Sequence, residues 1–168
     1  MVQRRFLHAE RLGQLAARRP PQAGASVVHG DYRPDNTIIG PGRPHIAAII
    51  DWELPTLGDP LTDLGMLLTC WHDLGDTERE RIPVAAGLTA HEGFPDSHQV
   101  AERYAQLTGR DLSQLPFYRA LSCMKLAVIL EGVRVRHSSG HTVSAGYDAV
   151  GDPVPALVAA GLRILPRP

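Results

Sequence analysis

A chain of 168 residues with a hydrophobic fraction of 43% suits one domain or one large lobe that can build a real core. The formal charge of −1 at pH 7 argues against nucleic acid or an anionic membrane surface as a partner. Two cysteines in apolar stretches, Cys70 and Cys123, are expected to be reduced core residues, and with neither a signal peptide nor a membrane-length apolar run predicted, the expected location is cytoplasmic.

The first part of the chain predicts one helix and a β-hairpin. In chain order we expect a helix, a short apolar run, a polar segment and two strands, over residues 2–18, 26–28, 29–36, 37–39 and 46–50. The glycines and prolines of segment 40–44 are a strong turn signal between the strands. Because the second strand is apolar without interruption, we expect it to be buried on both faces.

The rest of the chain is predicted to be helical. After Pro55, four leucines share one face of a helix: Leu61, Leu64, Leu67 and Leu68. A second helix is expected from Pro95 to Gly109, and its inward-facing residues are Val100, Tyr104 and Leu107. Long helices over 115–136 and 153–165 flank a Gly/Ser-rich segment, 138–151, that is expected to be a mobile loop. The expected fold class is α+β, mostly helical, with one small hairpin.

The polar segment from His29 to Asn36 has the spacing of a kinase catalytic loop. Asp31 follows His29 by two residues and precedes Asn36 by five. In such a loop the Asp accepts a hydrogen bond from the attacking hydroxyl, and the Asn turns back to offer a neutral oxygen to Mg²⁺. A lone Asp with a later Asn is common in turns, so this fragment is weak evidence by itself.

The far strand of the predicted hairpin ends at another acid, Asp51. The hairpin returns the chain to the end at which the polar loop lies, so Asp51 is expected near Asp31 and Asn36. Mg²⁺ prefers oxygen ligands and usually takes one or two carboxylates together with substrate phosphates. Asn36 and Asp51 are therefore candidate Mg²⁺ ligands, and Asp51 could link the metal to the phosphates of a nucleotide.

Three motifs carry a resemblance to a known family: His29-Gly30-Asp31 with Asn36, Ile50-Asp51-Trp52-Glu53, and Gly58-Asp59-Pro60-Leu61 with Asp63-Leu64. Together they resemble the aminoglycoside phosphotransferase and choline kinase superfamily, and more particularly the kinase-like domain of acyl-CoA dehydrogenase family members ten and eleven. Shorter matches extend the resemblance over nearly the whole chain, among them Gly93-Phe94-Pro95 and Ile129-Leu130-Glu131-Gly132-Val133.

The resemblance implies one lobe over residues 1–168, the C-terminal (catalytic) lobe of a protein-kinase-like fold, with the hairpin beside the catalytic loop. It implies that Asp31 is the catalytic Asp and that Asn36 and Asp51 are the Mg²⁺ ligands. Asp63 resembles a carboxylate that hydrogen-bonds the loop backbone, and His29 is implied to orient that loop. The implied reaction transfers the γ-phosphoryl group of ATP to a hydroxyl of a small molecule, for which a hydroxyacyl-CoA is one candidate.

Several polar residues around these motifs keep more than one interpretation. Arg33 and Asp35 could contact substrate or pair with each other, and Glu53 could touch a second metal or have a structural role. Asp59 could be the N-cap of the helix that follows it. Asp63 could be an ordinary first-turn acid favoured by the helix dipole.

Other residues favour structural interpretations. Trp52 is expected to pack against core or loop rather than form a substrate wall. Lys125 lies among apolar neighbours and is interpreted as a snorkelling helix residue. His137 and His141 have a zinc-like spacing but no further ligand nearby, so both are expected to be solvated.

The nucleotide-binding lobe of such kinases precedes the catalytic loop and carries a Lys that pairs with the phosphates. Only 28 residues precede His29, and the one Lys of the chain is Lys125. We therefore expect that lobe to be absent from this sequence, and the isolated chain to be inactive and able to self-associate. The chain could be a fragment, half of a split protein or a degenerate relative.

Two other function classes compete with the phosphotransferase interpretation. A non-catalytic binding or interaction module could keep the lobe without the reaction, and the absence of the second lobe favours it. A metal-dependent hydrolase ranks last, because it would need more carboxylates near Asp31 and Asp51.

Overall fold

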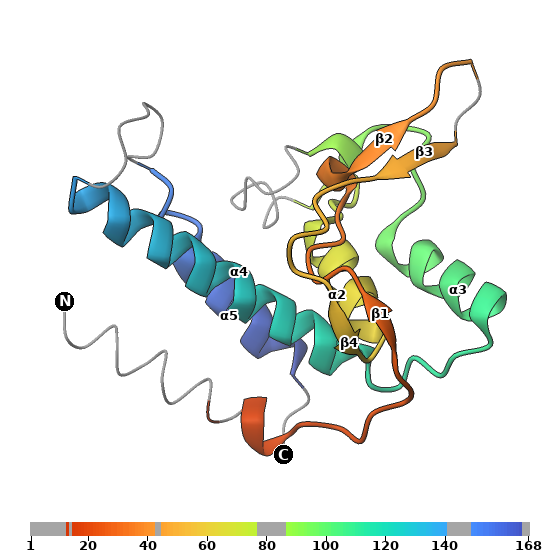
Figure 1. Ribbon diagram of the computed structural model, residues 1–168, viewed down its shortest axis with the longest axis horizontal. Helices are drawn as coiled ribbons and strands as arrows, with labels where there is room; N and C mark the ends of the chain where they lie inside the picture. Colours follow the sequence, from red (N-terminus) through yellow and green to blue (C-terminus); the bar gives the residue numbers. More distant parts are fainter. Residues whose placement is uncertain (1–12, 14, 43–44, 77–86, 141–148, 166–168) are drawn as a thin grey trace.

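A computed structural model describes residues 13, 15–42, 45–76, 87–140 and 149–165 (Figure 1). The elements over these residues, in chain order, are β1 (Ser26–Val28), the 3₁₀ helix η1 (Pro34–Asn36), β2 (Thr37–Ile39), β3 (Ile46–Ile49), β4 (Thr56–Gly58), α2 (Leu61–Cys70), the 3₁₀ helix η3 (Leu88–Ala90), α3 (Ser97–Thr108), α4 (Leu115–Ser138) and α5 (Val154–Ile164). The helix predicted over 2–18 and the loop predicted over 138–151 lie partly outside the described residues.

Two small antiparallel sheets flank the polar loop. Strands β2 and β3 form the predicted hairpin, with an irregularity between Ile38 and Ile39. Strands β1 and β4 form a second sheet that the sequence analysis missed, in which Val27 pairs with Leu57. Strand β4 has only three residues. Its partner β1 precedes the loop and the hairpin in the sequence, whereas β4 follows them, so no local sequence pattern predicts this pairing.

The expectation that the second hairpin strand is buried on both faces is wrong. Ile46 is 51% exposed and Ile50, just after the strand, is 42% exposed. The reason is that β3 pairs with β2 alone in a two-stranded sheet. An uninterrupted apolar run is typical of a strand covered on both faces, but the described residues place no third strand beside β3.

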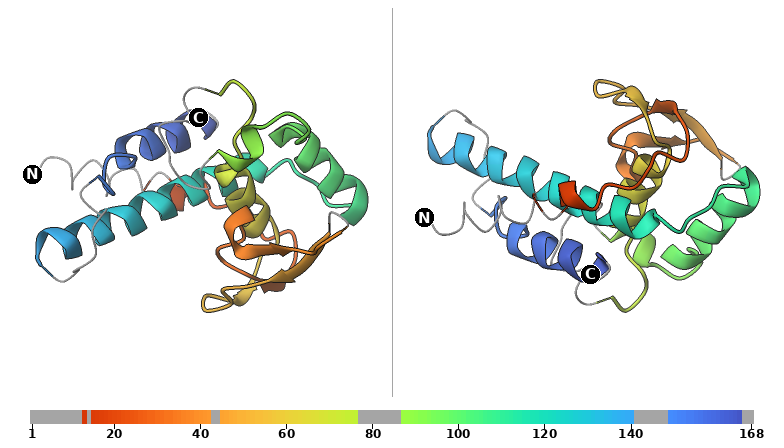
Figure 2. Two further views of the ribbon diagram at one scale, coloured as in Figure 1. Left: turned by 90° about the horizontal axis from the view of Figure 1, so that it is seen from above. Right: turned by 90° about the horizontal axis from the view of Figure 1, so that it is seen from below.

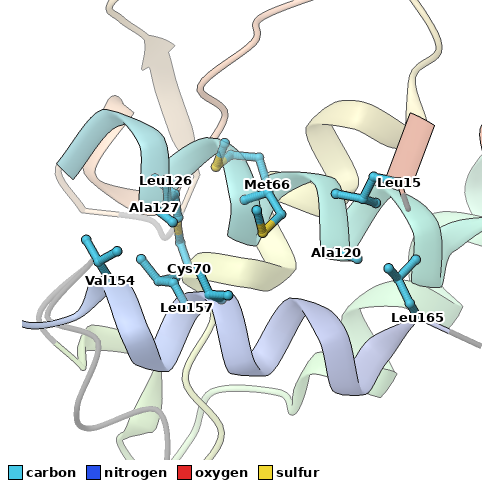
Figure 3. Packing of buried hydrophobic residues seen from close by; sticks show 11 residues of the cluster. Leu15, Met66, Cys70, Ala120, Leu126, Ala127, Val154, Leu157 and Leu165 are labelled. Carbon is cyan, nitrogen blue, oxygen red and sulfur yellow. The ribbon is translucent and has the colours of Figure 1, made fainter. Parts of the chain in front are cut away.

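The main core lies between α2, α4 and α5. Helices α4 and α5 run side by side in both views of Figure 2, on the opposite side of α2 from the hairpin. Their buried side chains meet those of α2 and the N-terminal Leu15, and Figure 3 labels nine members of this cluster: Leu15, Met66, Cys70, Ala120, Leu126, Ala127, Val154, Leu157 and Leu165. The two cysteines, Cys70 and Cys123, are free and buried, as predicted.

Helix α3 packs on a smaller cluster formed by leucines of α2 and the start of α4. Its predicted start is confirmed by a capping box between Asp96 and Gln99, and its predicted end by Gly109 in the left-handed region. Val100 and Tyr104 face the cluster, but Leu107 is 68% exposed, so its predicted inward position is wrong. Position 107 lies near the C-terminal end of α3, beyond the part of the helix that packs on α2.

Over the described residues, no helix combines the length and the apolar character needed to cross a membrane.

Candidate functional site

The predicted catalytic loop leaves strand β1 at His29 and makes a sharp turn at Gly30. The Gly30 backbone has a φ of 83°, which favours glycine. A Cβ at this position would lie 2.7 Å from the carbonyl oxygen of Leu54, closer than real side chains approach. The turn therefore depends on glycine both for its backbone conformation and for the space beside the 51–55 segment.

The carboxylate of Asp63, in the first turn of α2, accepts hydrogen bonds from the loop backbone. Its oxygens lie 2.7 Å from the amide nitrogen of His29 and 2.9 Å from that of Gly30. Asp63 thus makes the contact expected of it, while its loop-orienting role stays a prediction. Burial, and secondarily the negative charge of Asp63, raises the pKa of the Tyr32 hydroxyl within the loop.

The imidazole of His29 connects the loop to the end of the hairpin. Its Nδ1 accepts a hydrogen bond from the amide of Asp31 at 3.2 Å, so the ring hydrogen is carried by Nε2. That Nε2 then donates to the carbonyl oxygen of Ile50 at 2.8 Å. The ring is almost fully buried and packs against Trp52 with 4.6 Å between ring centroids, so Trp52 has the packing role that was expected.

Asn36 closes the loop and is buried. Its Nδ2 donates to the backbone carbonyl of Asp31 at 2.8 Å and lies 3.3 Å from the Asp31 carboxylate. This orientation turns the amide oxygen, Oδ1, away from Asp31, which leaves it as the atom that could bind a cation. The short helix η1 and the hydrogen bond from Thr37 to Pro34 hold Asn36 at the start of β2.

The backbone next to Asp51 is tied to the same loop. The Ile50 amide donates to the Asn36 carbonyl at 2.9 Å, and the Ile50 carbonyl accepts from His29. Asp51 itself has a φ of 68°, a left-handed conformation that is uncommon for a residue other than glycine. Such outliers often occur at functional sites, and here the outlier gives a sharp end to the hairpin and leaves the Asp51 side chain exposed.

The donor set fits a hard divalent cation with few protein ligands. Among the residues that the structure describes, no three His, Cys, Asp or Glu side chains gather as metal ligands. The two candidate ligands predicted from the sequence are the Asn36 amide oxygen and the carboxylate of Asp51, the residue after Ile50, whose backbone is bonded to the loop. Such a sparse oxygen set suits Mg²⁺, which keeps water and phosphate oxygens as its other ligands, better than a metal that needs a closed protein cage.

Arg33 lies between two acids of the loop. Its Nε is 3.3 Å from the Asp31 carboxylate and its Nη1 is 3.5 Å from that of Asp35. The Nε contact has the distance of an ion pair without the geometry of a hydrogen bond. Of the two interpretations left open, the structure therefore contains the Arg33–Asp35 pairing, and it adds a contact to Asp31. Glu53 is exposed, and its role stays a prediction.

Sequence reasoning missed a contact made by Lys125. The side chain was interpreted as a snorkelling lysine, but its Nζ donates a hydrogen bond to the carbonyl oxygen of Gly30. The partners are 95 positions apart, so no local pattern links them. The available signal was a lysine within a run of helix residues that are otherwise apolar.

The N-cap of α2 is Pro60, so the interpretation of Asp59 as the N-cap is wrong, and Asp59 instead links three segments. It is buried and accepts hydrogen bonds from the Leu61 amide at 2.9 Å and from the Ala23 amide at 2.8 Å. The Tyr118 hydroxyl of α4 also donates to it, and burial together with this carboxylate raises the pKa of Tyr118 to about 12. His137 lies in the last turn of α4, whereas His141 lies outside the described residues.

Comparisons with known proteins show which proteins this chain is similar to. A mouse protein, acyl-CoA dehydrogenase family member 10, is 32% identical over 142 residues, which cover 81% of this chain and 13% of that protein. Mouse acyl-CoA dehydrogenase family member 11 is 32% identical over 143 residues, covering 84% of this chain and 18% of its own length. The Arabidopsis thaliana protein described as probable acyl-CoA dehydrogenase IBR3 is 31% identical over 86% of this chain. The chain thus spans less than a fifth of the length of these relatives.

A solved structure and a family model extend these similarities to the fold. The crystal structure of a Ralstonia eutropha protein assigned as an aminoglycoside phosphotransferase matches with a TM-score of 0.77 and 32% identity, over 94% of this chain and 48% of that chain. The model described as the phosphotransferase enzyme family matches residues 3–118. Because this match covers more than half of the sequence and the superposition covers nearly all of it, the chain belongs to the phosphotransferase enzyme family and has a kinase-like fold.

Proposed function

We propose that this chain is the catalytic lobe of an ATP- and Mg²⁺-dependent phosphotransferase that transfers the γ-phosphoryl group to a hydroxyl of a small molecule. The observation that carries the proposal is the hydrogen-bonded loop. The Asn36 Nδ2 is anchored on Asp31, which leaves the side-chain oxygen of Asn36 turned away from Asp31. The backbone carbonyl of Asn36 accepts a hydrogen bond from the amide of Ile50, the residue before Asp51. A base and two oxygen donors held on one loop and one hairpin end are among the parts that phosphoryl transfer requires.

Each residue then has a defined task. Asp31 accepts a hydrogen bond from the substrate hydroxyl and orients it toward the phosphate. Asn36 and Asp51 hold Mg²⁺, which neutralises charge on the phosphate oxygens when it is bound. His29 and Asp63 keep the loop backbone in place, so that Asp31 needs little reorganisation when substrate arrives.

The substrate that we favour is a hydroxyacyl compound, and a hydroxyacyl-CoA is the first candidate. The support is that the relatives of this chain are described as acyl-CoA dehydrogenase family members, whose names refer to acyl-CoA chemistry. A family match alone does not choose among phosphotransferase substrates, so the substrate has to be tested directly.

The phosphates of ATP need a further cationic partner. The single lysine of this sequence donates to the Gly30 carbonyl, so a Lys that grips the α- and β-phosphates has to come from a nucleotide-binding lobe. We therefore propose that transfer requires such a lobe, fused or in trans. The same observation favours the second candidate, a non-catalytic binding module, for the 168-residue chain by itself.

The proposal is tested by single-turnover kinetics with labelled ATP, Mg²⁺ and a panel of hydroxylated compounds that includes hydroxyacyl-CoAs. The chain is assayed alone and joined to the nucleotide-binding lobe of a family member. We expect negligible transfer by the chain alone, transfer by the joined protein, and loss of that transfer with Asp31→Ala. A matched Asp76→Ala variant, which changes an acid outside the loop, controls for the loss of charge.

The outcomes separate the candidates. If the joined protein transfers phosphate and Asp31→Ala retains the rate, the catalytic assignment is wrong. If the joined protein folds and binds ATP but phosphorylates no hydroxyl compound, the binding-module function is favoured. Fast transfer by the isolated chain would show that these residues hold the triphosphate without another lobe.

A further inference from the structure

The peptide unit between Gly30 and Asp31 is held at both ends. Its N–H donates to the Nδ1 of His29, and its carbonyl oxygen accepts a hydrogen bond from Lys125. On one side, the amides of His29 and Gly30 are bound by Asp63; on the other, the carbonyl of Asp31 is bound by Asn36. Among these contacts to the loop backbone, the one from Lys125 is made by a cation.

Helix α4 brings Lys125 to the loop through its packing against α2. The two helices touch closely at Gly65, where an added Cβ would lie 2.7 Å from the backbone of Tyr118. Lys125 follows Tyr118 by seven residues, two helical turns later, so the two side chains leave α4 on a similar face. Lys125 is itself partly buried, and its ammonium donates to the carbonyl oxygen of Gly30.

A lysine that only covers apolar surface keeps its ammonium in water. The Lys125 ammonium instead points to a carbonyl of the loop, and a hydrogen bond with a charged donor is about twice as strong as a neutral one. The peptide that it holds is the one that leads into Asp31. A shift of this peptide would move the Asp31 carboxylate together with the Asn36 amide that is bonded to it.

We propose that Lys125 is a positioning residue for phosphoryl transfer, which fixes the Gly30–Asp31 peptide and through it the Asp31 carboxylate and the Asn36 amide. This inference rests on the proposed function for its consequence in catalysis, but the positioning of the loop can be measured without any reaction. Lys125 does not itself replace the lysine that grips the nucleotide phosphates, because its ammonium is already bound within the lobe.

The experiment measures amide hydrogen exchange by NMR and Mn²⁺ binding by the EPR signal of the free ion, both on the 168-residue chain. Lys125→Met keeps the apolar stem without the charge, Lys125→Gln keeps a neutral donor, and Lys125→Arg keeps a charged donor. Arg103→Met removes a cation from the exposed face of α3 and serves as the matched control. Thermal unfolding of every variant checks that the fold is kept.

We expect Lys125→Met to speed exchange of the Gly30 and Asp31 amides by about tenfold or more and to weaken Mn²⁺ binding. Lys125→Gln should give a smaller change, Lys125→Arg should restore values close to wild type, and Arg103→Met should leave the loop unchanged. In the joined protein, Lys125→Met should lower kcat more than it raises the KM for ATP, because it misplaces Asp31 rather than a binding surface.

Unchanged loop exchange in Lys125→Met would overturn the inference and return Lys125 to a covering role. Loss of loop protection in Arg103→Met as well would show a general effect of charge, which also overturns it. If the wild-type chain binds no Mn²⁺, the metal site of the proposed function fails, while the exchange measurement still decides the role of Lys125.

Discussion

At the scale of single residues, the loop around Asp31 is held by side chains that come from distant parts of the sequence. Asp63 reaches it from α2, Lys125 from α4, and His29 links it to the hairpin end at Ile50. A loop of eight residues has no regular hydrogen-bond ladder of its own, so such contacts have to satisfy its backbone. Removal of one partner therefore affects both the stability of the chain and the geometry of the site.

The first prediction concerns Asp63. Asp63→Ala should lower the free energy of unfolding by about 1–3 kcal/mol, because two amides of the loop lose their acceptor. Urea unfolding followed by circular dichroism gives this value, and Glu92→Ala, an exposed acid beyond α2, is the control. A loss for Asp63→Ala no larger than for Glu92→Ala would mean that water replaces the carboxylate at little cost.

The second prediction concerns pH and Tyr118. The pKa of Tyr118 is raised to about 12 in the folded chain, mainly by burial and also by its hydrogen bond to Asp59. An unfolded tyrosine loses its proton near pH 10, so the folded state binds more protons between these values. The stabilising contribution of Tyr118 is therefore complete below about pH 10 and declines as the pH rises toward about 12.

Urea unfolding across this alkaline range measures the effect, with Tyr118→Phe as the comparison. The variant should be less stable than wild type at neutral pH and should lose stability less steeply above about pH 10. Some slope should persist in it, because burial also raises the pKa of Tyr32 and of Tyr104. Identical slopes for the two proteins would contradict the assignment of the shift to Tyr118.

At the scale of the elements, the contact between α2 and α4 connects the core to the site. Gly65 of α2 lies directly against the backbone of Tyr118 in α4. The first turn of α2 presents Asp63 to the loop, and two turns beyond Tyr118 α4 presents Lys125 to it. Because both helices bring a side chain to Gly30, their spacing decides whether the loop can satisfy both contacts at once.

The third prediction compares two helical glycines. Gly65→Ala should destabilise the chain by about 1–3 kcal/mol, because a Cβ would lie 2.7 Å from the Tyr118 backbone. Gly132→Ala, in α4, should stabilise it by up to about 1 kcal/mol, because Ala is the better helix former and the site is open. Thermal and urea unfolding of both variants give the two signs, and stabilisation by Gly65→Ala would show that the helices are less closely packed.

The elements that the sequence predicted well are those with local signals. The ends of α3 follow from Asp96 and Gly109, and the hairpin follows from the turn residues between β2 and β3. Strand β4 was missed because its pairing with β1 is non-local and only three residues long. The prediction that β3 is buried on both faces was wrong, because an apolar run predicts covering layers that the described residues do not provide.

The contacts of the candidate site likewise divide into those that a local motif predicts and those between distant segments. His29, Asp31 and Asn36 belong to one short motif, so their proximity was predictable from spacing. The contact of Asp63 with the loop came from a family resemblance rather than from the spacing itself. The contact of Lys125 with Gly30 was not predicted, because it depends on how α4 crosses α2, and a sequence pattern does not encode a crossing between helices.

At the scale of the whole molecule, several elements carry exposed apolar side chains. The main core lies between α2, α4 and α5. Both small sheets carry exposed apolar side chains, as does the outer face of α4. On the sheet formed by β1 and β4, Val27 is 66% exposed and its cross-strand partner Leu57 is 76% exposed. From the sequence we also expect an apolar surface around Phe6 and Leu7, where the absent lobe would pack, but both residues lie outside the described part of the chain.

The last prediction concerns the association of the isolated chain. Val27 and Leu57 face the opposite side of their sheet from the buried Val28, so they form a directly paired apolar surface. Contiguous apolar surface on a monomer commonly marks an interaction site, and in a solution of this chain alone the available partner is a second copy. We expect sedimentation velocity to show association that increases with protein concentration. A Val27→Thr/Leu57→Thr double variant should reduce this association, and threonine keeps the β-propensity of both strands.

Leu107→Thr, which changes an equally exposed leucine on α3, is the control and should leave the association unchanged. A wild-type chain that stays monomeric up to high concentration, or a double variant that associates as wild type does, would contradict a role for this sheet surface in self-association.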